Sequence, residues 1–233
     1  MEKKLLRINN WQGRLGNNII QLINILSIAL LFNFNIEIPK HDFFKKQYIN
    51  INKNLNYDEE LTDIYNFFHM PEKFKFYNYK NYIDQIKIIL MDLFKIDYKK
   101  FDPLDDNSVV IHIRSGDIFT DKNPNENYIN PPLDYYIHIL EKYRFKKIYL
   151  IAEDSLNPCI NKLLEKYPNI YFSINSLEKD IEYILRAKNI IMSYGSFVPS
   201  LVFLTNYTKN IFIPSYAILI KNDAINIFPV IVK

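Results

Sequence analysis

In the second half of the chain, short apolar runs alternate with segments that carry apolar residues at helical spacing. Strands are predicted at residues 108–114, 146–152, 169–174, 189–193 and 210–214, and helices at residues 132–144, 156–167, 197–205 and in a segment capped by Asn175 with Glu178 three positions later. Strands and helices that alternate at this pitch favour a mostly parallel sheet covered on both faces.

The first half has a less regular pattern. Residues 4–9 and 34–39 predict strands, and residues 17–32, 57–68 and 79–94 predict helices. This is a reduced α/β unit with added helices. The segment FDPLDD at 101–106 is the predicted linker, so we expect two domains, 1–104 and 105–233.

Composition and charge exclude several classes of protein. The chain has 233 residues, of which 48% are hydrophobic and 24% charged, as in ordinary globular proteins. The net charge is only +3 and the lysine pairs are scattered, so we expect no nucleic-acid partner. The single cysteine, Cys159, allows no intrachain disulfide, and without a Cys/His cluster we expect no metal site.

The most apolar run, residues 19–32, is interrupted by Gln21 and Asn24. It is shorter than the ~20 apolar residues that cross a bilayer, and it lacks the flanks of a signal peptide. We therefore expect a cytoplasmic protein without a transmembrane segment. The sequence indicates no oligomeric state.

Candidate chemistry gathers directly after the predicted strands, where ligands bind in an open parallel sheet. All four glycines lie there: Gly13 and Gly16 follow the first strand, and Gly116 and Gly195 follow two strands of the second half. Glycine at such places permits a positive φ or the close approach of a ligand to the backbone. Ordinary tight turns are the alternative.

Two basic residues, His112 and Arg114, end the predicted strand at 108–114, and the acidic Asp117 follows it. His112 and Arg114 share one face because side chains alternate along a strand. A guanidinium at this place needs an anion, which is either Asp117 or a ligand, and its planar fork fits a phosphate. The segment Gly195-Ser196-Phe197 is a second candidate, because N–H groups at a helix start bind phosphate oxygens. Together they suggest a diphosphate.

Glu153 and Asp154 follow the neighbouring strand. A carboxylate there can accept hydrogen bonds from a ribose or a base, and an ordinary helix-start aspartate is the alternative. The familiar glycine-rich nucleotide motifs are absent, because GRLGNN is neither GxGxxG nor a P-loop. No DxD pair follows a strand in the first half, which argues against a metal-dependent sugar transferase.

Four segments resemble motifs of the fucosyltransferases, both the α-1,2-fucosyltransferases and the protein O-fucosyltransferases. GRLGNNIIQ at 13–21 resembles their G-x-[LF]-G-N-Q motif, and VVIHIRSGD at 109–117 resembles H-x-R-x-G-D. IYLIAED at 148–154 is similar to the strand that ends in Ser-Asp-Asp, and DIEYILRAKNIIMSYGSF at 180–197 is similar to the segment that leads to Ser-Thr-Phe. Order and spacing agree from Gly13 to Phe197.

The resemblance implies a GT-B fold with two Rossmann-like halves and an inverting, metal-independent transfer of fucose from GDP-fucose to a glycan hydroxyl. Residues 1–104 would then bind the glycan acceptor, and residues 105–233 the nucleotide-sugar donor. The implied donor site has Arg114, Gly195, Ser196 and Phe197 at the diphosphate, with His112 and Asp154 near the guanosine. The implied cleft wall on the acceptor side has Gly13, Arg14, Gly16, Asn17 and Gln21.

Asn17 and Gln21 lie four positions apart on one helix face, from which they could hydrogen-bond the acceptor or contact a neighbouring helix. Asp117 is the first candidate for the general base. The motifs differ from the family pattern at Ala152-Glu153-Asp154 and at Gly195-Ser196-Phe197. Two alternatives therefore stay open: a transferase for another nucleotide sugar, and a non-catalytic module that binds nucleotides or glycans.

Overall fold

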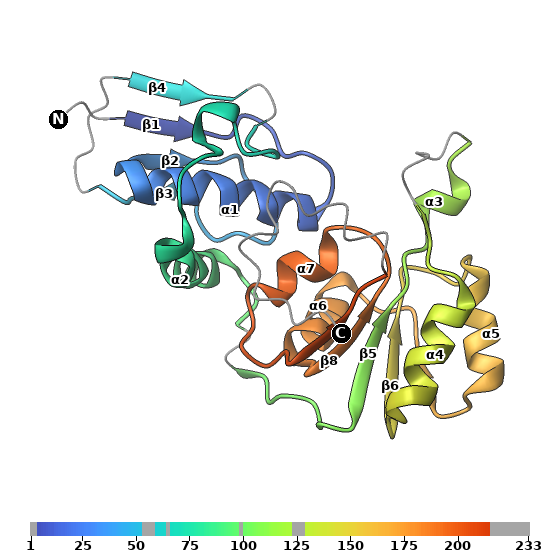
Figure 1. Ribbon diagram of the computed structural model, residues 1–233. Helices are drawn as coiled ribbons and strands as arrows, with labels where there is room; N and C mark the ends of the chain where they lie inside the picture. Colours follow the sequence, from blue (N-terminus) through green and yellow to red (C-terminus); the bar gives the residue numbers. More distant parts are fainter. Residues whose placement is uncertain (1–3, 53–58, 64–65, 98–99, 123–128, 215–233) are drawn as a thin grey trace. The chain divides into compact units, whose positions relative to one another are not determined.

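The structure is a computed structural model, and it describes residues 4–52, 59–63, 66–97, 100–122 and 129–214 (Figure 1). Contacts between residues divide the chain into two compact units. The first contains the described residues up to Asp97, and the second contains those from Lys100 to Pro214. Each unit is α/β with a mostly parallel sheet, which confirms the predicted fold class. The roles predicted for the two domains stay predictions.

The first unit contains a four-stranded sheet in the order β3-β2-β1-β4. Its strands are β1 (Lys4–Arg7), β2 (Asn35–Glu37), β3 (Tyr48–Ile49) and β4 (Glu59–Thr62), and its helices are α1 (Leu15–Phe32), α2 (Ile83–Leu93) and the short 3₁₀ turns Glu72–Phe74 and Lys80–Tyr82. β2 and β4 both run parallel to β1, and only β3 is antiparallel. β1 therefore lies between β2 and β4, and the loop that follows it lies at the carboxyl end of this central strand.

Helix α1 fills the core of the first unit. It is apolar on nearly all sides and mostly buried, as expected for a helix enclosed by other elements. Within the described part of the chain, it is the one helix long and apolar enough to cross a membrane by length and composition. It ends at Asn33, which adopts the left-handed conformation with φ 61°.

The second unit contains five parallel strands in the order β7-β6-β5-β8-β9. The strands are β5 (Ser108–His112), β6 (Lys147–Ile151), β7 (Ile170–Phe172), β8 (Asn189–Met192) and β9 (Asn210–Phe212). The helices are α3 (Asp117–Thr120), α4 (Leu133–Tyr143), α5 (Pro158–Lys166), α6 (Leu177–Arg186) and α7 (Phe197–Val202). The chain moves outward from β5 in one direction and returns to place β8 on its other side, which creates a topological switch point between β5 and β8.

The alternation along β5 separates its two faces. Val109, Ile111 and Ile113 belong to the buried cluster that packs against α4 and α5. His112 faces the opposite side, where its ring contacts that of Phe197 at the start of α7. Helices α4 and α5 pack together, as do α6 and α7, so each pair covers one face of the sheet (Figure 1). His112 at the end of β5 therefore lies beside Phe197 at the start of α7.

Two sequence predictions were wrong. Residues 57–68 were expected to be helical, but their described part contains β4, because pairing along β1 outweighs the helical spacing of the apolar residues. The cap of α6 was expected at Asn175, but Ser176 is the N-cap and its hydroxyl accepts from Lys179 N. The Asn175 amide instead donates to Asp180 Oδ1 (3.1 Å). The other predicted helices and strands agree in type, with ends that differ by up to four residues.

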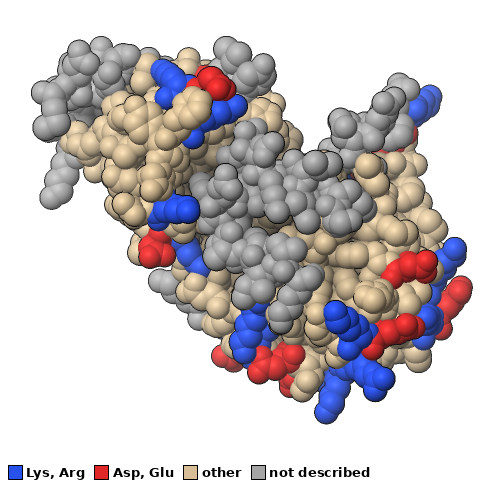
Figure 2. Space-filling model, in the orientation of Figure 1, with Lys and Arg blue, Asp and Glu red and all other residues tan. Residues whose placement is uncertain are grey.

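Charged side chains are interspersed on the surface. On the face drawn in Figure 2, lysine and arginine side chains lie among aspartate and glutamate side chains and form no continuous basic stripe over the described residues. Several basic side chains are paired, such as Lys188 and Lys209, which both contact Asp106 Oδ1 at 3.1 Å. The absence of a nucleic-acid partner stays a prediction.

Candidate active site

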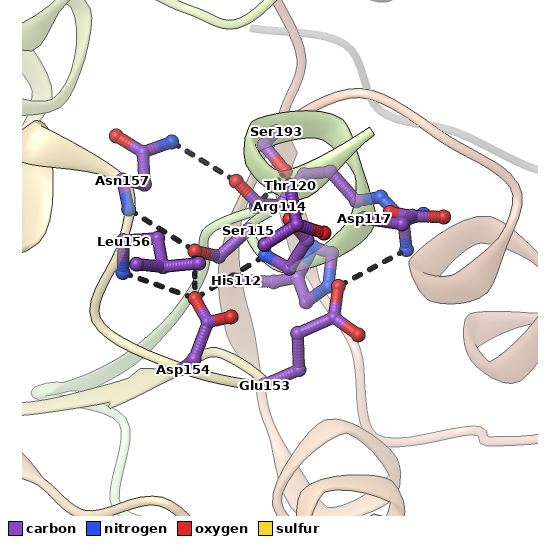
Figure 3. Close-up of polar contacts among 11 residues, drawn as sticks. His112, Arg114, Ser115, Asp117, Thr120, Glu153, Asp154, Leu156, Asn157 and Ser193 are labelled. Carbon is purple, nitrogen blue, oxygen red and sulfur yellow. Dashed lines mark hydrogen bonds and ion pairs between the residues drawn. The ribbon is translucent and has the colours of Figure 1, made fainter. Parts of the chain in front are cut away.

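At the switch point of the second unit, one serine connects the ends of β5 and β8 by hydrogen bonds. Ser193, directly after β8, donates its N–H to His112 O (3.0 Å) at the end of β5. Its hydroxyl oxygen accepts from Arg114 N (2.8 Å) and lies 3.3 Å from His112 Nδ1 (Figure 3). The loops that follow β5 and β8 are therefore held together at their base.

Arg114 emerges from this junction with its side chain mostly buried, at 19% exposure. Its Nη2 donates to Asp117 Oδ1 (2.5 Å), and its Nη1 lies 3.6 Å from Glu153 Oε1 (Figure 3). Among the described residues, the bond to Asp117 is the only hydrogen bond of the guanidinium, which has five N–H donors. A mostly buried group with so many remaining donors is suited to an anionic ligand with several oxygens.

Asp154 holds the loop after β5 through hydrogen bonds. Its Oδ1 accepts hydrogen bonds from the Ser115 hydroxyl, from Gly116 N (3.2 Å) and from Leu156 N (3.0 Å). Burial by itself raises the pKa of Asp154, but these hydrogen bonds favour the ionised carboxylate and hold the pKa below its usual range. The carboxylate thus braces the loop that carries Arg114.

Asn157 completes this support. It donates its N–H to Ser115 Oγ (3.1 Å) and its amide group to Arg114 O (2.9 Å), while its Oδ1 caps α5 by accepting from Cys159 N (3.0 Å). The sequence analysis missed Ser115, Asn157 and Ser193. An asparagine followed by proline at a helix start is a capping signal that could have identified Asn157.

Gly116 is required by its conformation and by its neighbour. Its φ is +68°, and a Cβ placed there would lie 2.8 Å from Glu153 Cγ and closer still to the carboxylate of that side chain. Glu153 therefore approaches Arg114 through space that only a glycine leaves open. Gly195, in the loop after β8, has φ +116°, and no atom of the described residues lies within 4 Å of the position of a Cβ.

His112 is a neutral group at this site. Its ring centroid lies 5.6 Å from that of Phe197. Burial, together with the positive charge of Arg114, lowers the pKa of His112 to about 3. Ser196 is the N-cap of α7, and its side chain makes no capping hydrogen bond. The predicted donor-site residues are thus drawn from the ends of β5, β6 and β8.

The loop after β1 in the first unit is organised by Gln21. This side chain is fully buried, with 0% exposure. Its Oε1 accepts from Gln12 N (2.9 Å), and its Nε2 donates to Asn66 O (2.7 Å) and Asn10 O (3.2 Å). Asn66 Oδ1 in turn accepts from Asn9 N (2.9 Å) and Asn10 N (3.2 Å). The buried amides therefore satisfy the loop backbone from the inside.

The other predicted residues of this loop differ in exposure. Gly13 and Arg14 are exposed and Asn17 is half-buried, whereas Gly16 is buried as the second residue of α1. Gly13 has φ +64°, and a Cβ there would overlap the Asn17 side chain, with its Cγ 3.3 Å away. The positive φ expected of a glycine is thus present at Gly13, while Gly16 lies in the helix.

Two further residues of the first unit support the loop and were missed from the sequence. Asn18 Nδ2 donates to Gln12 O (3.0 Å), and Asn18 Oδ1 lies 3.1 Å from His41 Nε2. Burial lowers the pKa of His41, despite the opposing effect of Asp42. Asn18 follows Asn17 directly in the sequence. Only the structure distinguishes the two side chains, because Asn18 is buried and Asn17 is half-buried.

A separate cavity of about 220 Å³ lies beside β6 and β7. Its lining includes Tyr149, Tyr171, Tyr183 and Asn175, and the Tyr149 ring lies 5.5 Å from Tyr171 and 5.1 Å from Tyr183. These residues belong to neither loop described above. Among the residues that the structure describes, no group of three or more His, Cys, Asp and Glu side chains could hold a metal ion.

Asp180, which accepts a hydrogen bond from Asn175, provides a pH-dependent prediction. Burial raises the pKa of Asp180 to about 6 from 3.8, so the folded protein holds this proton more tightly than the unfolded chain. Its contribution to stability therefore falls as the pH rises from about 4 to about 6 and stays low above that range. We expect Asp180→Asn to raise the free energy of unfolding by about 1–3 kcal/mol at pH 7.5 and to change it little at pH 4. Urea unfolding at both pH values measures this, and an equal effect at both would contradict it.

Comparison with known proteins identifies the family. A sequence model of glycosyl transferase family 11 matches residues 15–216. No curated protein sequence matches the chain. Solved structures similar to it include POFUT1 in complex with GDP-fucose (10% identity, 92% of this chain and 98% of that chain, TM-score 0.49). They also include a variant of Arabidopsis thaliana FUT1 in complex with GDP (12% identity, 96% and 74%, TM-score 0.49) and NodZ α-1,6-fucosyltransferase soaked with GDP-fucose (9% identity, 88% and 93%, TM-score 0.47).

At these identities and scores, the assignment rests on the family model. That model covers most of the chain, from the start of α1 through the loops after β5, β6 and β8. The chain therefore belongs to glycosyl transferase family 11 and is an enzyme of the fucosyltransferase superfamily, as its motifs predicted.

Proposed function

We propose that this glycosyltransferase transfers fucose from GDP-fucose to a glycan hydroxyl, with inversion at the anomeric carbon and without a metal ion. The observation that carries the proposal is Arg114, whose mostly buried guanidinium stands at the switch point with a single hydrogen bond among the described residues. Ligands of open parallel sheets bind at this place, and a guanidinium fork recognises phosphate oxygens in pairs.

The donor would lie along the ends of β5 and β8. In this proposal, Arg114 binds the diphosphate, and Ser196 and Phe197 contribute backbone N–H groups from the first turn of α7. Gly195, with its positive φ, shapes the loop that presents them. His112 lies near the guanosine as a neutral ring, and Asp154 acts by bracing the Arg114 loop.

The reaction is a single displacement. The acceptor oxygen forms a bond to the anomeric carbon as the bond from that carbon to the phosphate oxygen breaks, and GDP leaves with the electron pair. Negative charge grows on the leaving phosphate, where Arg114 and the N–H groups stabilise it. Because this charge is neutralised by the protein itself, the mechanism needs no metal ion.

The acceptor hydroxyl loses its proton to a general base, for which Asp117 is the first candidate. Asp117 is partly exposed at the end of the Arg114 loop and is hydrogen-bonded to Arg114. A base has to reach the acceptor oxygen within about 3 Å, and the hydrogen bond to Arg114 engages only Oδ1 of Asp117.

The first unit would bind the acceptor. In this proposal the exposed Gly13 and Arg14 and the half-buried Asn17 form its binding surface, with Gly16 placing α1 beneath them. Gln21 acts from the inside by holding the loop in shape. In this proposal the first unit is the acceptor-side domain and the second unit the donor domain of a cytoplasmic enzyme.

Nucleotide-dependent thermal stabilisation tests the donor. At about 100 times Kd, a specific ligand stabilises the folded protein by about 2.7 kcal/mol. We expect GDP-fucose and GDP to raise Tm, whereas UDP- and dTDP-sugars do not. A shift with another nucleotide sugar would support a different donor, and a GDP-fucose shift without transfer or donor hydrolysis would support a binding module. No shift with any nucleotide would contradict the proposal.

NMR of the product reports inversion, and the rate in EDTA reports metal dependence.

A further inference from the structure

The charges around Arg114 do not favour a diphosphate as they stand. The guanidinium is paired with two carboxylates, those of Asp117 and Glu153. His112, with its pKa of about 3, adds no positive charge at neutral pH. The three charged groups sum to one negative charge at the place where the donor phosphates are expected. Departure of one carboxylate from Arg114 would therefore favour the binding of a diphosphate.

The two carboxylates hold Arg114 in different ways. Asp117 Oδ1 takes a hydrogen bond from Nη2 at 2.5 Å, whereas Glu153 Oε1 stands 3.6 Å from Nη1, beyond hydrogen-bond distance. Glu153 is packed against the α-carbon of Gly116, where a Cβ would overlap it. Only Asp117 thus occupies an N–H group that a phosphoryl oxygen would use.

Asp117 is also the more exposed of the two partners, since Glu153 is 38% exposed. Asp117 is 46% exposed and is the first residue of α3, which is only four residues long. It follows Gly116, whose φ of +68° places it where the chain turns away from the sheet. Arg114, in contrast, is fixed through its backbone by Ser193 and Asn157. These bonds favour a change of partner in which Asp117 moves while the Arg114 backbone stays in place.

We propose that the Asp117 carboxylate occupies, in the ligand-free enzyme, the position on Arg114 Nη2 that a phosphoryl oxygen of the donor takes on binding. Donor binding is then an exchange of one oxygen anion for another at a guanidinium that stays in place. The exchange releases the Asp117 carboxylate into the site beside the bound diphosphate. This inference rests on the proposed function for the identity of the anion, a diphosphate.

Titration of inorganic pyrophosphate by calorimetry tests the exchange without the nucleoside or the sugar. Asp117→Asn removes the competing charge, so we expect pyrophosphate to bind roughly two- to five-fold more tightly than to the wild type, the range typical of a partly exposed ion pair. Asp121→Asn is the matched control, since it removes an exposed carboxylate at the end of the same short helix, whereas Arg114 is paired with Asp117 and Glu153. We expect no change in that variant.

A second pair of variants distinguishes an exchange at Arg114 from a general effect of removing a negative charge. In an Arg114→Ala protein, adding Asp117→Asn should produce no gain in pyrophosphate affinity. Unchanged or weaker binding by Asp117→Asn alone would overturn the proposal. So would a gain that persists without Arg114, or a failure of both the wild type and Asp117→Asn to bind pyrophosphate. If pyrophosphate behaves as expected but GDP-fucose does not bind, the proposed donor is wrong and the exchange stands.

Discussion

Replacement of Arg114 by alanine is expected to lower the rate of fucosyl transfer by about 100- to 1000-fold, the loss typical of a group that stabilises developing negative charge. The side chain is expected to contact the leaving diphosphate, and its partners Asp117 and Glu153 are both partly exposed. Removal should therefore change the free energy of unfolding by no more than about 1 kcal/mol. Steady-state kinetics with GDP-fucose and urea unfolding measure the two effects on one protein preparation.

Arg114→Lys is the matched control for charge. A lysine retains the positive charge but replaces a planar fork by a single ammonium group, so it should recover little of the lost rate. Near-normal turnover in Arg114→Ala would contradict the assignment of this residue. Full recovery in Arg114→Lys would show that charge alone is needed and that the fork is not.

Gln21→Leu is expected to destabilise the first unit by about 2–4 kcal/mol, since each buried backbone group that loses its partner costs about 1–3 kcal/mol. The wild-type amide serves Gln12 N, Asn66 O and Asn10 O, and leucine can replace none of these bonds. Urea unfolding measures the stability. Hydrogen exchange at the Gln12 amide reports whether the loop has opened.

Gln12→Ala is the control, because the Gln12 side chain is exposed and its backbone N–H is kept. We expect it to change the stability by less than about 0.5 kcal/mol. If Gln21→Leu were as stable as Gln12→Ala, with the Gln12 amide equally protected, the amide network would not be what holds this loop.

The donor-side residues were accessible to sequence reasoning because their signals are local. His112 ends β5 and Arg114 follows it by two positions, and the strand before His112 is a continuous apolar run, as expected for a strand buried on both faces. Gly13, Gly116 and Gly195 all have positive φ, as their positions after strands predicted. The roles predicted for these residues stay predictions.

Gln21 and Asp154 show where local reasoning ended. Gln21 was predicted on a helix face and Asp154 after a strand, both as residues that would face a ligand, but both side chains hydrogen-bond the protein backbone. The sequence pattern around a glutamine on a helix face is the same whether its side chain points to a ligand or to a loop. Its direction depends on Asn66, which is 45 positions away.

The sequence by itself determined the alternation of strands and helices in the second unit and the motifs that identify the family. Each of these depends on residues close together in the chain. The tertiary structure alone decided that residues 59–62 form β4, that Ser193 holds Arg114 from 79 positions away, and that Glu153 fits against Gly116. These contacts follow from the order of the strands in each sheet, which brings distant loops to one edge, and no local period records that order.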